Sequence, residues 1–501
     1  MSEPPTDGVG SLPVTEPPTH APASLLANSA FMLLARGFTL ATGGALAIYA
    51  IRSFSVVSYG RYAIAVALIT IFTALSEMGI SSLALRRMSY DDDRMETSLA
   101  TALAAEAVTS LAALAFLFPV AIILGYPHEV LLLLAIGSGI VLFQGILGAL
   151  EAAFKARRLM ANVAVYSIVQ SGVTAALGFP LVALGAGPAG LVAAVAIGAA
   201  AAFPLGLLLL RRRLGITPDW TGVWRTVLPF LRASIPIALT GAVTVIYERV
   251  DLLMISKLDN AAAAAIYAVP LTIVQYTLLI PAVIGTAFFP VLAKTLQSDV
   301  KEARSSLFLL SRLFLLASAP IAIFLMASGG ELVTAVFGQR YESSGPVLTL
   351  LAWTIIFGFQ IFLLWYALLA TFHERGMVGI MVFGLVLNVA LNAFLIPAYG
   401  PKGAAAALIV SDLTILVGQA SLVQRHVFSI PWLQLFAKPL AATAVTVPVV
   451  LLLRPSSGLL AGAVGAITFL TVLLGTQYVS RNEWRPLTDP IEMQLGRLRR
   501  A

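Results

Sequence analysis

The chain is built from long apolar blocks separated by short polar stretches. About fourteen of these blocks hold the roughly 20 consecutive apolar residues that a helix needs to cross a bilayer. The pattern therefore predicts an all-α polytopic membrane protein. The expected spans are residues 25–50, 61–84, 98–124, 130–153, 161–184, 189–210, 232–256, 264–292, 306–328, 346–371, 377–397, 403–423, 438–453 and 458–479.

Composition supports this class and excludes several others. Hydrophobic residues make up 59% and charged residues 11% of the chain, against roughly 45–50% and 25% in soluble domains. The sequence contains no cysteine, which excludes disulfides, thiol catalysis and cysteine-ligated metals. It has no P-loop motif and no pair of histidines at metal-binding spacing. We therefore expect a protein that is not an enzyme, with no catalytic residue, metal or cofactor.

The basic residues gather in alternate loops. The net charge of +7 is therefore explained by the orientation of the chain in the membrane, and it does not indicate nucleic-acid binding. The segments rich in Lys and Arg are residues 86–94, 155–158, 211–225, 294–304 and 481–500. The positive-inside rule then predicts that both termini are cytoplasmic. We expect a disordered tail over residues 1–24 and a basic cytoplasmic tail over residues 481–501.

Two short patterns recur in the same order in the two halves of the chain. Tyr62-Ala63 returns as Tyr267-Ala268, and Gly187-Pro188 returns as Gly400-Pro401. The repeat predicts two six-helix bundles of like orientation, with a binding site between them. The expected divisions are residues 25–213 and 232–425 for the bundles, 214–231 for an interfacial linker, and 438–480 for two extra helices.

Charged side chains inside the spans are the main functional candidates. Each costs several kcal/mol in hydrocarbon unless it faces protein or a water-filled cavity. Glu248, Arg249 and Asp251 fall in the seventh expected span, and Asp412 lies near the middle of the twelfth. Arg36 lies within the first span. This pattern favours a polar path through the membrane over a purely structural bundle.

Amide side chains form a second group of candidates. Asn388 and Asn392 are separated by four residues, so they share one face of a helix in the eleventh span, and Gln170 lies in the fifth. Such amides commonly make hydrogen bonds between helices in membranes. The alternative interpretation is that these amides bind sugar hydroxyls.

Four segments together resemble one family of transporters. They are Ser58–Arg87, Tyr247–Pro270, Ala335–Trp353 and Asn388–Ala407. The chain resembles the polysaccharide flippases (Wzx-type, O-antigen transporters) of the multidrug/oligosaccharidyl-lipid/polysaccharide exporter superfamily. The resemblance implies about fourteen helices in two six-helix bundles plus two extra helices. It also implies translocation of undecaprenyl-pyrophosphate-linked glycans across the bacterial inner membrane.

The residues and the resemblance together give a specific hypothesis. Arginines would hold the pyrophosphate of a lipid-linked glycan, amides would hold sugar hydroxyls, and carboxylates would bind a coupling cation or proton. The expected substrate-binding residues are Arg36, Arg52, Arg249, Gln170, Asn388 and Asn392. The expected coupling-ion residues are Asp412, Glu248 and Asp251.

Other functions remain open at this point. The same fold serves lipid II flippases and cation-coupled multidrug antiporters, and a scaffold that organises glycan enzymes without transporting anything is a different class. The flippase hypothesis implies the membrane and a lipid-linked glycan as partners, with a polymerase and glycosyltransferases beside them, and no nucleic acid. Lipopolysaccharide O-antigen and exopolysaccharide are not distinguished by the sequence.

Overall fold

The computed structural model describes residues 22–90, 94–371, 373–427, 429 and 431–480, and every regular element in these ranges is a helix. The first seven helices are α1 (Pro22–Ser53), α2 (Val56–Glu77), α3 (Ile80–Tyr90), α4 (Met95–Ile123), α5 (His128–Ala156), α6 (Met160–Ala183) and α7 (Gly187–Leu214). The next are α8 (Val223–Leu258), α9 (Ala261–Ser298), α10 (Val300–Phe337), the 3₁₀ helix η1 (Gln339–Ser344), α11 (Gly345–Ala370), α12 (Glu374–Tyr399) and α13 (Pro401–His426). The last two are α14 (Trp432–Leu453) and α15 (Gly458–Gly475).

The number of membrane spans agrees with the pattern of apolar blocks. Thirteen helical stretches of the described chain are long and apolar enough to cross a bilayer, with α2 and α3 counted as one. The two parts of α8, Val223–Ile235 and Ile237–Leu258, are bent by 52° and together provide a fourteenth. The prediction of an all-α protein with about fourteen spans is confirmed. The chain breaks between α2 and α3 because Met78 and Gly79 adopt φ values of 41° and 66°.

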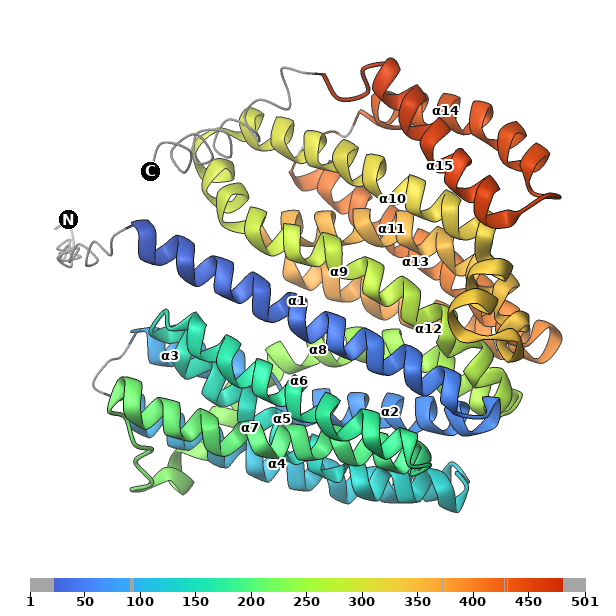
Figure 1. Ribbon diagram of the computed structural model, residues 1–501. Helices are drawn as coiled ribbons and strands as arrows, with labels where there is room; N and C mark the ends of the chain where they lie inside the picture. The colour runs from blue at the N-terminus through green and yellow to red at the C-terminus, as the bar shows by residue number, and fades with distance from the viewer. Residues whose placement is uncertain (1–21, 91–93, 372, 428, 430, 481–501) are drawn as a thin grey trace, which may run out of the picture.

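The helices pack as two groups beside each other (Figure 1). In the N-terminal bundle, α1–α7, the closest packing is of α7 against α6 and α5, of α5 against α2 and α4, and of α1 against α6. In the C-terminal bundle, α8–α13, α11 packs against α9, α10 and α13, while α12 packs against α13 and α8. The core is continuous between the bundles, because one buried hydrophobic cluster includes residues of both.

Helix α2 makes the main contact between the bundles, since it packs along α8 and α9. A Cβ atom at Gly60 would collide with the Ala261 carbonyl oxygen, so only glycine permits this approach of α2 to the start of α9. The rings of Tyr59 and Tyr341 also meet there, edge to face, with centroids 6.2 Å apart. We call the face at which α1 and α10 end the outer face, following the predicted topology.

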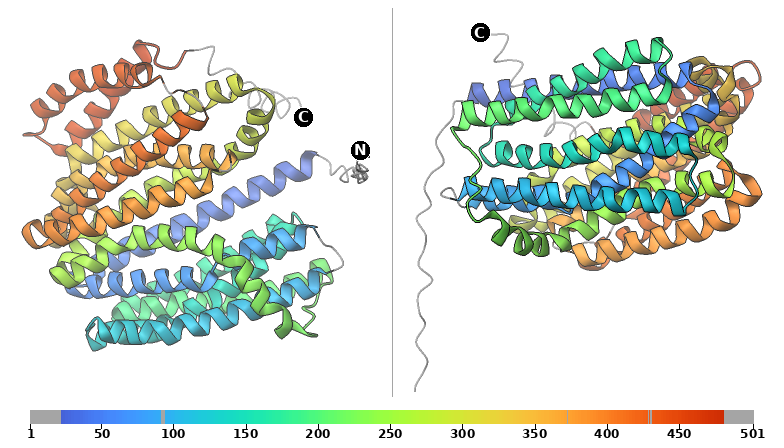
Figure 2. Two further views of the ribbon diagram at one scale, coloured as in Figure 1. Left: turned by 180° about the vertical axis from the view of Figure 1, so that it is seen from behind. Right: turned by 90° about the horizontal axis from the view of Figure 1, so that it is seen from below.

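Helices α14 and α15 lie at the edge of the molecule, where α15 packs along α10 (Figure 2). Gly458 and Gly462 face the α10 backbone, and a Cβ atom at either position would lie 2.8 Å from a carbonyl oxygen of α10. Glu331 of α10 accepts hydrogen bonds from the Ser457 hydroxyl (2.8 Å) and the Leu459 amide (3.0 Å). The carboxylate of Glu331 therefore caps the N-terminus of α15 and fixes it to α10.

Several expected boundaries shift in the structure. Residues 223–231, expected as interfacial linker, form the first part of α8, because Val223, Val227 and Phe230 share one buried face against the N-terminal bundle. The first extra helix begins at Trp432 rather than at residue 438. Most of the expected N-terminal tail and all of the basic tail at 481–501 lie outside the described residues.

Candidate functional site

A buried polar cluster occupies the interior of the C-terminal bundle, where α8, α9 and α12 meet. The Asp251 carboxylate accepts hydrogen bonds from the Tyr267 hydroxyl (2.7 Å) and from the Asn392 side-chain amide (2.6 Å). The same Asn392 nitrogen donates to the Asn388 carbonyl oxygen at 2.9 Å. Asp251 is 3% exposed and both asparagines are fully buried. Asp251 precedes the end of α8 at Leu258 by seven residues, or about 10 Å of helix.

A second carboxylate extends this cluster from α13. Asp412 accepts a hydrogen bond of 2.6 Å from the hydroxyl of Tyr247 on α8. Tyr247 precedes Asp251 by four residues, so the two side chains lie one turn apart on the same face of α8. Helix α8 thus contributes to both Tyr–Asp pairs. We call Tyr247, Asp251, Tyr267, Asn388, Asn392 and Asp412 the carboxylate cluster.

The carboxylate cluster is rich in oxygen atoms and poor in positive charge. The hydrogen bonds described for Asp251 and Asp412 all come from neutral groups. The Asn388 amide nitrogen and the Asn392 carbonyl oxygen are buried without a hydrogen-bond partner among the described residues. Burying an ionised carboxylate without a counter-charge costs several kcal/mol, so such a group takes up a proton or a cation. The cluster has the chemistry of a site for either.

The sequence identified four of the six residues in this cluster. Asp251 and Asp412 stood out as charges inside spans, and Asn388 and Asn392 as an amide pair. The two tyrosines were not proposed as site residues. Tyr247 could have been found from its position one turn before Asp251, whereas nothing in the sequence shows that Tyr267 of the next helix reaches the same carboxylate.

Glu248 lies apart from the carboxylate cluster. Its side chain is exposed, and it interacts electrostatically with its neighbour Arg249. Arg249 is half-buried, and its Nε atom is buried without a hydrogen-bond partner among the described residues. Arg249 precedes the end of α8 by nine residues, which places it about 13 Å below the outer end of that helix. The three charges of the seventh expected span therefore occupy two environments.

The remaining predicted residues are distributed over α1 and α6. Arg36 is exposed on α1, about 25 Å from the outer end of that helix at Ser53. Gln170 is half-buried and donates a hydrogen bond of 3.2 Å to Gln144 of α5. That contact is an interhelical hydrogen bond, which is one of the two roles that the sequence suggested for these amides.

Arg52 binds backbone atoms of the opposite bundle at the outer face. Its guanidinium donates to the carbonyl oxygens of Val336 (2.6 Å) and Ala335 (2.5 Å) in the last turn of α10. The C-terminal carbonyls of a helix carry partial negative charge, so an arginine is favourable there. The position of Arg52 is thus explained by a contact between the bundles.

The fold is shared with several solved transporters. The structure of the lipid II flippase MurJ in an inward closed conformation superposes with a TM-score of 0.71 at 14% identity, over 90% of this chain and 99% of MurJ. A multidrug resistance MATE family transporter of the MOP superfamily gives 0.62 at 13% identity, over 77% of this chain and 94% of that chain. A MOP superfamily transporter from Pyrococcus furiosus gives 0.59 at 12% identity, over 80% and 95%. At these identities the likeness shows the fold.

Sequence similarity identifies a relative and a protein family. An uncharacterized membrane protein of Methanocaldococcus jannaschii is 26% identical over 210 residues, which are 40% of this chain and about half (48%) of that relative. Residues 51–346, more than half of the chain, match the family described as "Polysaccharide biosynthesis protein". The match runs from the end of α1 to the start of α11 and includes Arg249, Asp251 and Tyr267. The chain belongs to this polysaccharide biosynthesis family.

Proposed function

We propose that this protein is a flippase that moves polyprenyl-pyrophosphate-linked oligosaccharides across the cytoplasmic membrane by alternating access. Arg249 carries the proposal: it is an arginine within a membrane span whose Nε atom is buried without a protein acceptor among the described residues. A guanidinium binds phosphate oxygens in pairs through its planar N–H groups. Family membership and the fold shared with a lipid II flippase support the same conclusion.

Two arginines at different depths suit a substrate that must cross the membrane. Arg36 lies about 25 Å from the outer end of α1 and Arg249 about 13 Å from the outer end of α8. An anionic head group would bind Arg36 after entering from the inner side and Arg249 before leaving on the outer side. The polyprenyl tail would stay in the lipid, where it costs no desolvation. Rocking of one bundle against the other would alternate access to the head group.

The carboxylate cluster supplies the driving ion in this proposal. Asp251 and Asp412 would bind a proton or a monovalent cation, with the Asn388 and Asn392 carbonyl oxygens as further ligands. Both tyrosine hydroxyls keep the carboxylates oriented. Because α8 bears both Asp251 and Arg249, a shift of α8 on ion binding would move the phosphate-binding arginine. Ion binding and substrate release are thereby coupled through one helix.

The proposal implies a cellular setting. The protein would lie in a bacterial inner membrane with both termini in the cytoplasm. It would receive its substrate from glycosyltransferases at the inner face and deliver it to a polymerase at the outer face. Its product would be a surface glycan such as O-antigen or exopolysaccharide.

Reconstituted protein tests this function directly. Purified protein in liposomes is given a polyprenyl-pyrophosphate oligosaccharide with a fluorescent sugar, and dithionite reports the fraction in the outer leaflet over time. We expect the wild type to equilibrate the label, and Arg249→Ala to slow it at least tenfold, since a buried charge-assisted hydrogen bond contributes roughly 1.5–3 kcal/mol. Arg454→Ala, at the outer end of α14, is the matched control.

Three results would overturn the proposal. These are no movement with the wild type, full activity of Arg249→Ala, and equal slowing by Arg454→Ala. If lipophilic cations move while the glycan lipid does not, the protein is a multidrug antiporter. Lys at position 249 should restore part of the rate, because a point charge lacks the planar fork that grips two phosphate oxygens.

A further inference from the structure

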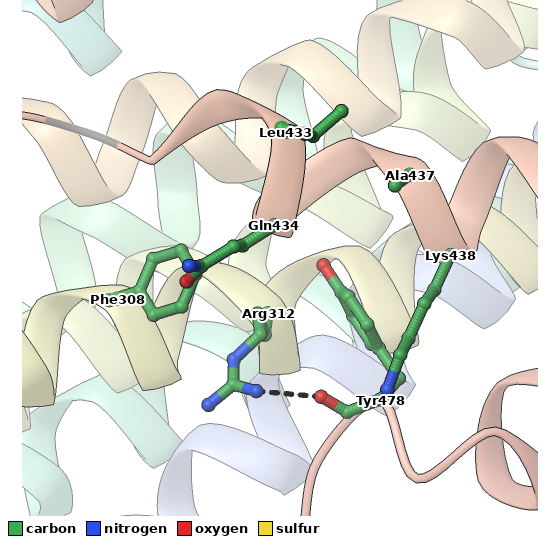
Figure 3. A pocket seen from close by; sticks show the side chains of 7 residues that line it. All are labelled: Phe308, Arg312, Leu433, Gln434, Ala437, Lys438 and Tyr478. Carbon is green, nitrogen blue, oxygen red and sulfur yellow. Dashed lines mark hydrogen bonds between the residues drawn. The ribbon is translucent and has the colours of Figure 1, made fainter.

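A cationic pocket lies at the edge of the C-terminal bundle, between α10, α14 and the turn that follows α15. It has a volume of about 370 Å³. Its lining residues are Phe308, Arg312, Leu433, Gln434, Ala437, Lys438 and Tyr478 (Figure 3). Within the part of the chain that the structure describes, the lining contains two cations and no acidic residue. None of these residues belongs to the site described above.

Contacts to the backbone hold both cations in place. Arg312 donates to the Tyr478 carbonyl oxygen at 2.7 Å, the contact drawn as a dashed line in Figure 3. Lys438 donates to the carbonyl oxygens of Thr476 (2.6 Å) and Gln477 (3.1 Å). The Tyr478 hydroxyl donates to the Leu435 carbonyl oxygen at 2.7 Å, which fixes the turn against α14. These carbonyl contacts orient the two side chains at the pocket.

The depth of the pocket corresponds to a lipid head group. Arg312 precedes the outer end of α10 at Phe337 by about 25 residues, or about 37 Å of helix, whereas the hydrocarbon layer is about 30 Å thick. Tyr478 follows the inner end of α15, which agrees with this level. Trp432 begins α14 nearby, and tryptophan is typical of the membrane–water interface.

Apolar side chains continue from the pocket along α14. Leu433 lines the pocket and is 81% exposed, and Leu440 and Val447 are 66% and 46% exposed. Their spacing of seven residues puts all three on one face of the helix. A lipid with its head group in the pocket would have this face of α14 beside its hydrocarbon chain.

We propose that this pocket binds the phosphate-bearing head group of a lipid in the inner leaflet. Paired cations at this depth suit phosphate oxygens, and basic pockets between helices at the inner face are suited to anionic head groups. The lipid is either a resident anionic phospholipid or a polyprenyl-linked substrate before transport. The site does not depend on the proposed function, because it requires only the charge and depth of the pocket.

Native mass spectrometry of delipidated full-length protein tests this proposal. We expect phosphatidylglycerol to bind at least tenfold more tightly than phosphatidylcholine. The double variant Arg312→Gln/Lys438→Gln should lose roughly tenfold or more in affinity, since each basic residue near anionic lipid contributes about 1 kcal/mol. Arg454→Gln removes a cation at the opposite end of α14 and should leave binding unchanged. Arg312→Lys/Lys438→Arg keeps both charges and should retain most of the affinity for phosphatidylglycerol.

Two further arms complete the test. If the double variant does not fold, Lys438→Gln alone tests the site, because that side chain is exposed. In addition, wild-type binding should weaken as the NaCl concentration rises from about 50 to about 500 mM. Competition between phosphatidylglycerol and undecaprenyl pyrophosphate identifies the preferred source of the phosphate. Unchanged phosphatidylglycerol binding in Arg312→Gln/Lys438→Gln or in Lys438→Gln would overturn the proposal. Equal affinity of the wild type for phosphatidylcholine and phosphatidylglycerol would overturn it too.

Discussion

Arg52 and Arg340 link the two bundles in opposite directions at the outer face. Arg52 at the end of α1 donates to the carbonyl oxygens of Val336 and Ala335, while Arg340 of η1 donates to the carbonyl oxygen of Phe54 at 2.8 Å. Each arginine thus binds the backbone beside the other. In the proposed alternating-access cycle, opening of the outer side would require both sets of hydrogen bonds to break.

Removing these arginines should favour outward opening. The double variant Arg52→Ala/Arg340→Ala loses charge-assisted hydrogen bonds of roughly 1.5–3 kcal/mol each, so we expect the outward-open population to rise at least tenfold. The chain contains no cysteine, so the substitution Ala264→Cys, at a fully buried position near the outer start of α9, gives a unique label site. An impermeant maleimide added from outside should react several-fold faster in the double variant.

The control for this experiment is another arginine of the outer face. Arg61 forms its salt bridge with Glu129 at 3.0 Å inside the N-terminal bundle, so it does not join the bundles. Arg61→Ala should leave the labelling rate unchanged. A labelling rate in Arg52→Ala/Arg340→Ala equal to that of Arg61→Ala would show that the arginine–carbonyl contacts do not hold the outer face together.

The approach of α2 to α9 gives a second prediction. Gly60→Ala drives a Cβ atom into the Ala261 carbonyl oxygen, a collision with backbone that no side-chain rotation can relieve. We expect this variant to separate the bundles at the outer face and to speed labelling in the Ala264→Cys background, as the arginine variant does. Gly125→Ala tests the effect of an added methyl group at an outer loop, because a Cβ atom there would meet nothing within 4 Å. Since Gly125 has a φ of 67°, its variant should lose some stability without changing the labelling rate.

The carboxylate cluster predicts how transport is driven. Asp251→Asn and Asp412→Asn nearly preserve side-chain size but remove the charge that would bind a cation or proton. We expect both variants to fold, and transport to lose its response to an imposed ion or pH gradient, with at least a tenfold fall in the gradient-driven rate. Glu129→Gln, at the outer face of the N-terminal bundle, is the control. A wild-type gradient response in both variants would contradict a coupling role for the cluster.

Topology is the fourth prediction. Reporter fusions after Arg213 and after Arg304 should be cytoplasmic, and a fusion at Gly338, between α10 and η1, should be external. The physical reason is the concentration of arginine and lysine in the loops of one side. An external signal at Arg213 would reverse the assignment of inner and outer faces throughout.

The sequence by itself determined the class, the spans and four residues of the carboxylate cluster. Span positions follow from local hydropathy, because each helix must satisfy its own backbone hydrogen bonds in lipid and so needs a continuous apolar segment. Asp251 and Asp412 were recognisable because charge in a span is costly wherever the helix packs. The spacing of Asn388 and Asn392 fixed their shared face without further information.

Only the tertiary structure decided which side chains meet. Tyr267 reaches Asp251 from the next helix, and Tyr247 reaches Asp412 across 165 positions of sequence. Arg52 contacts the last turn of α10, and Arg312 and Lys438 meet at the turn after α15. These contacts depend on the rotation and neighbours of each helix. Helix packing sets both, and hydropathy does not encode them because lipid and protein interior are similarly apolar.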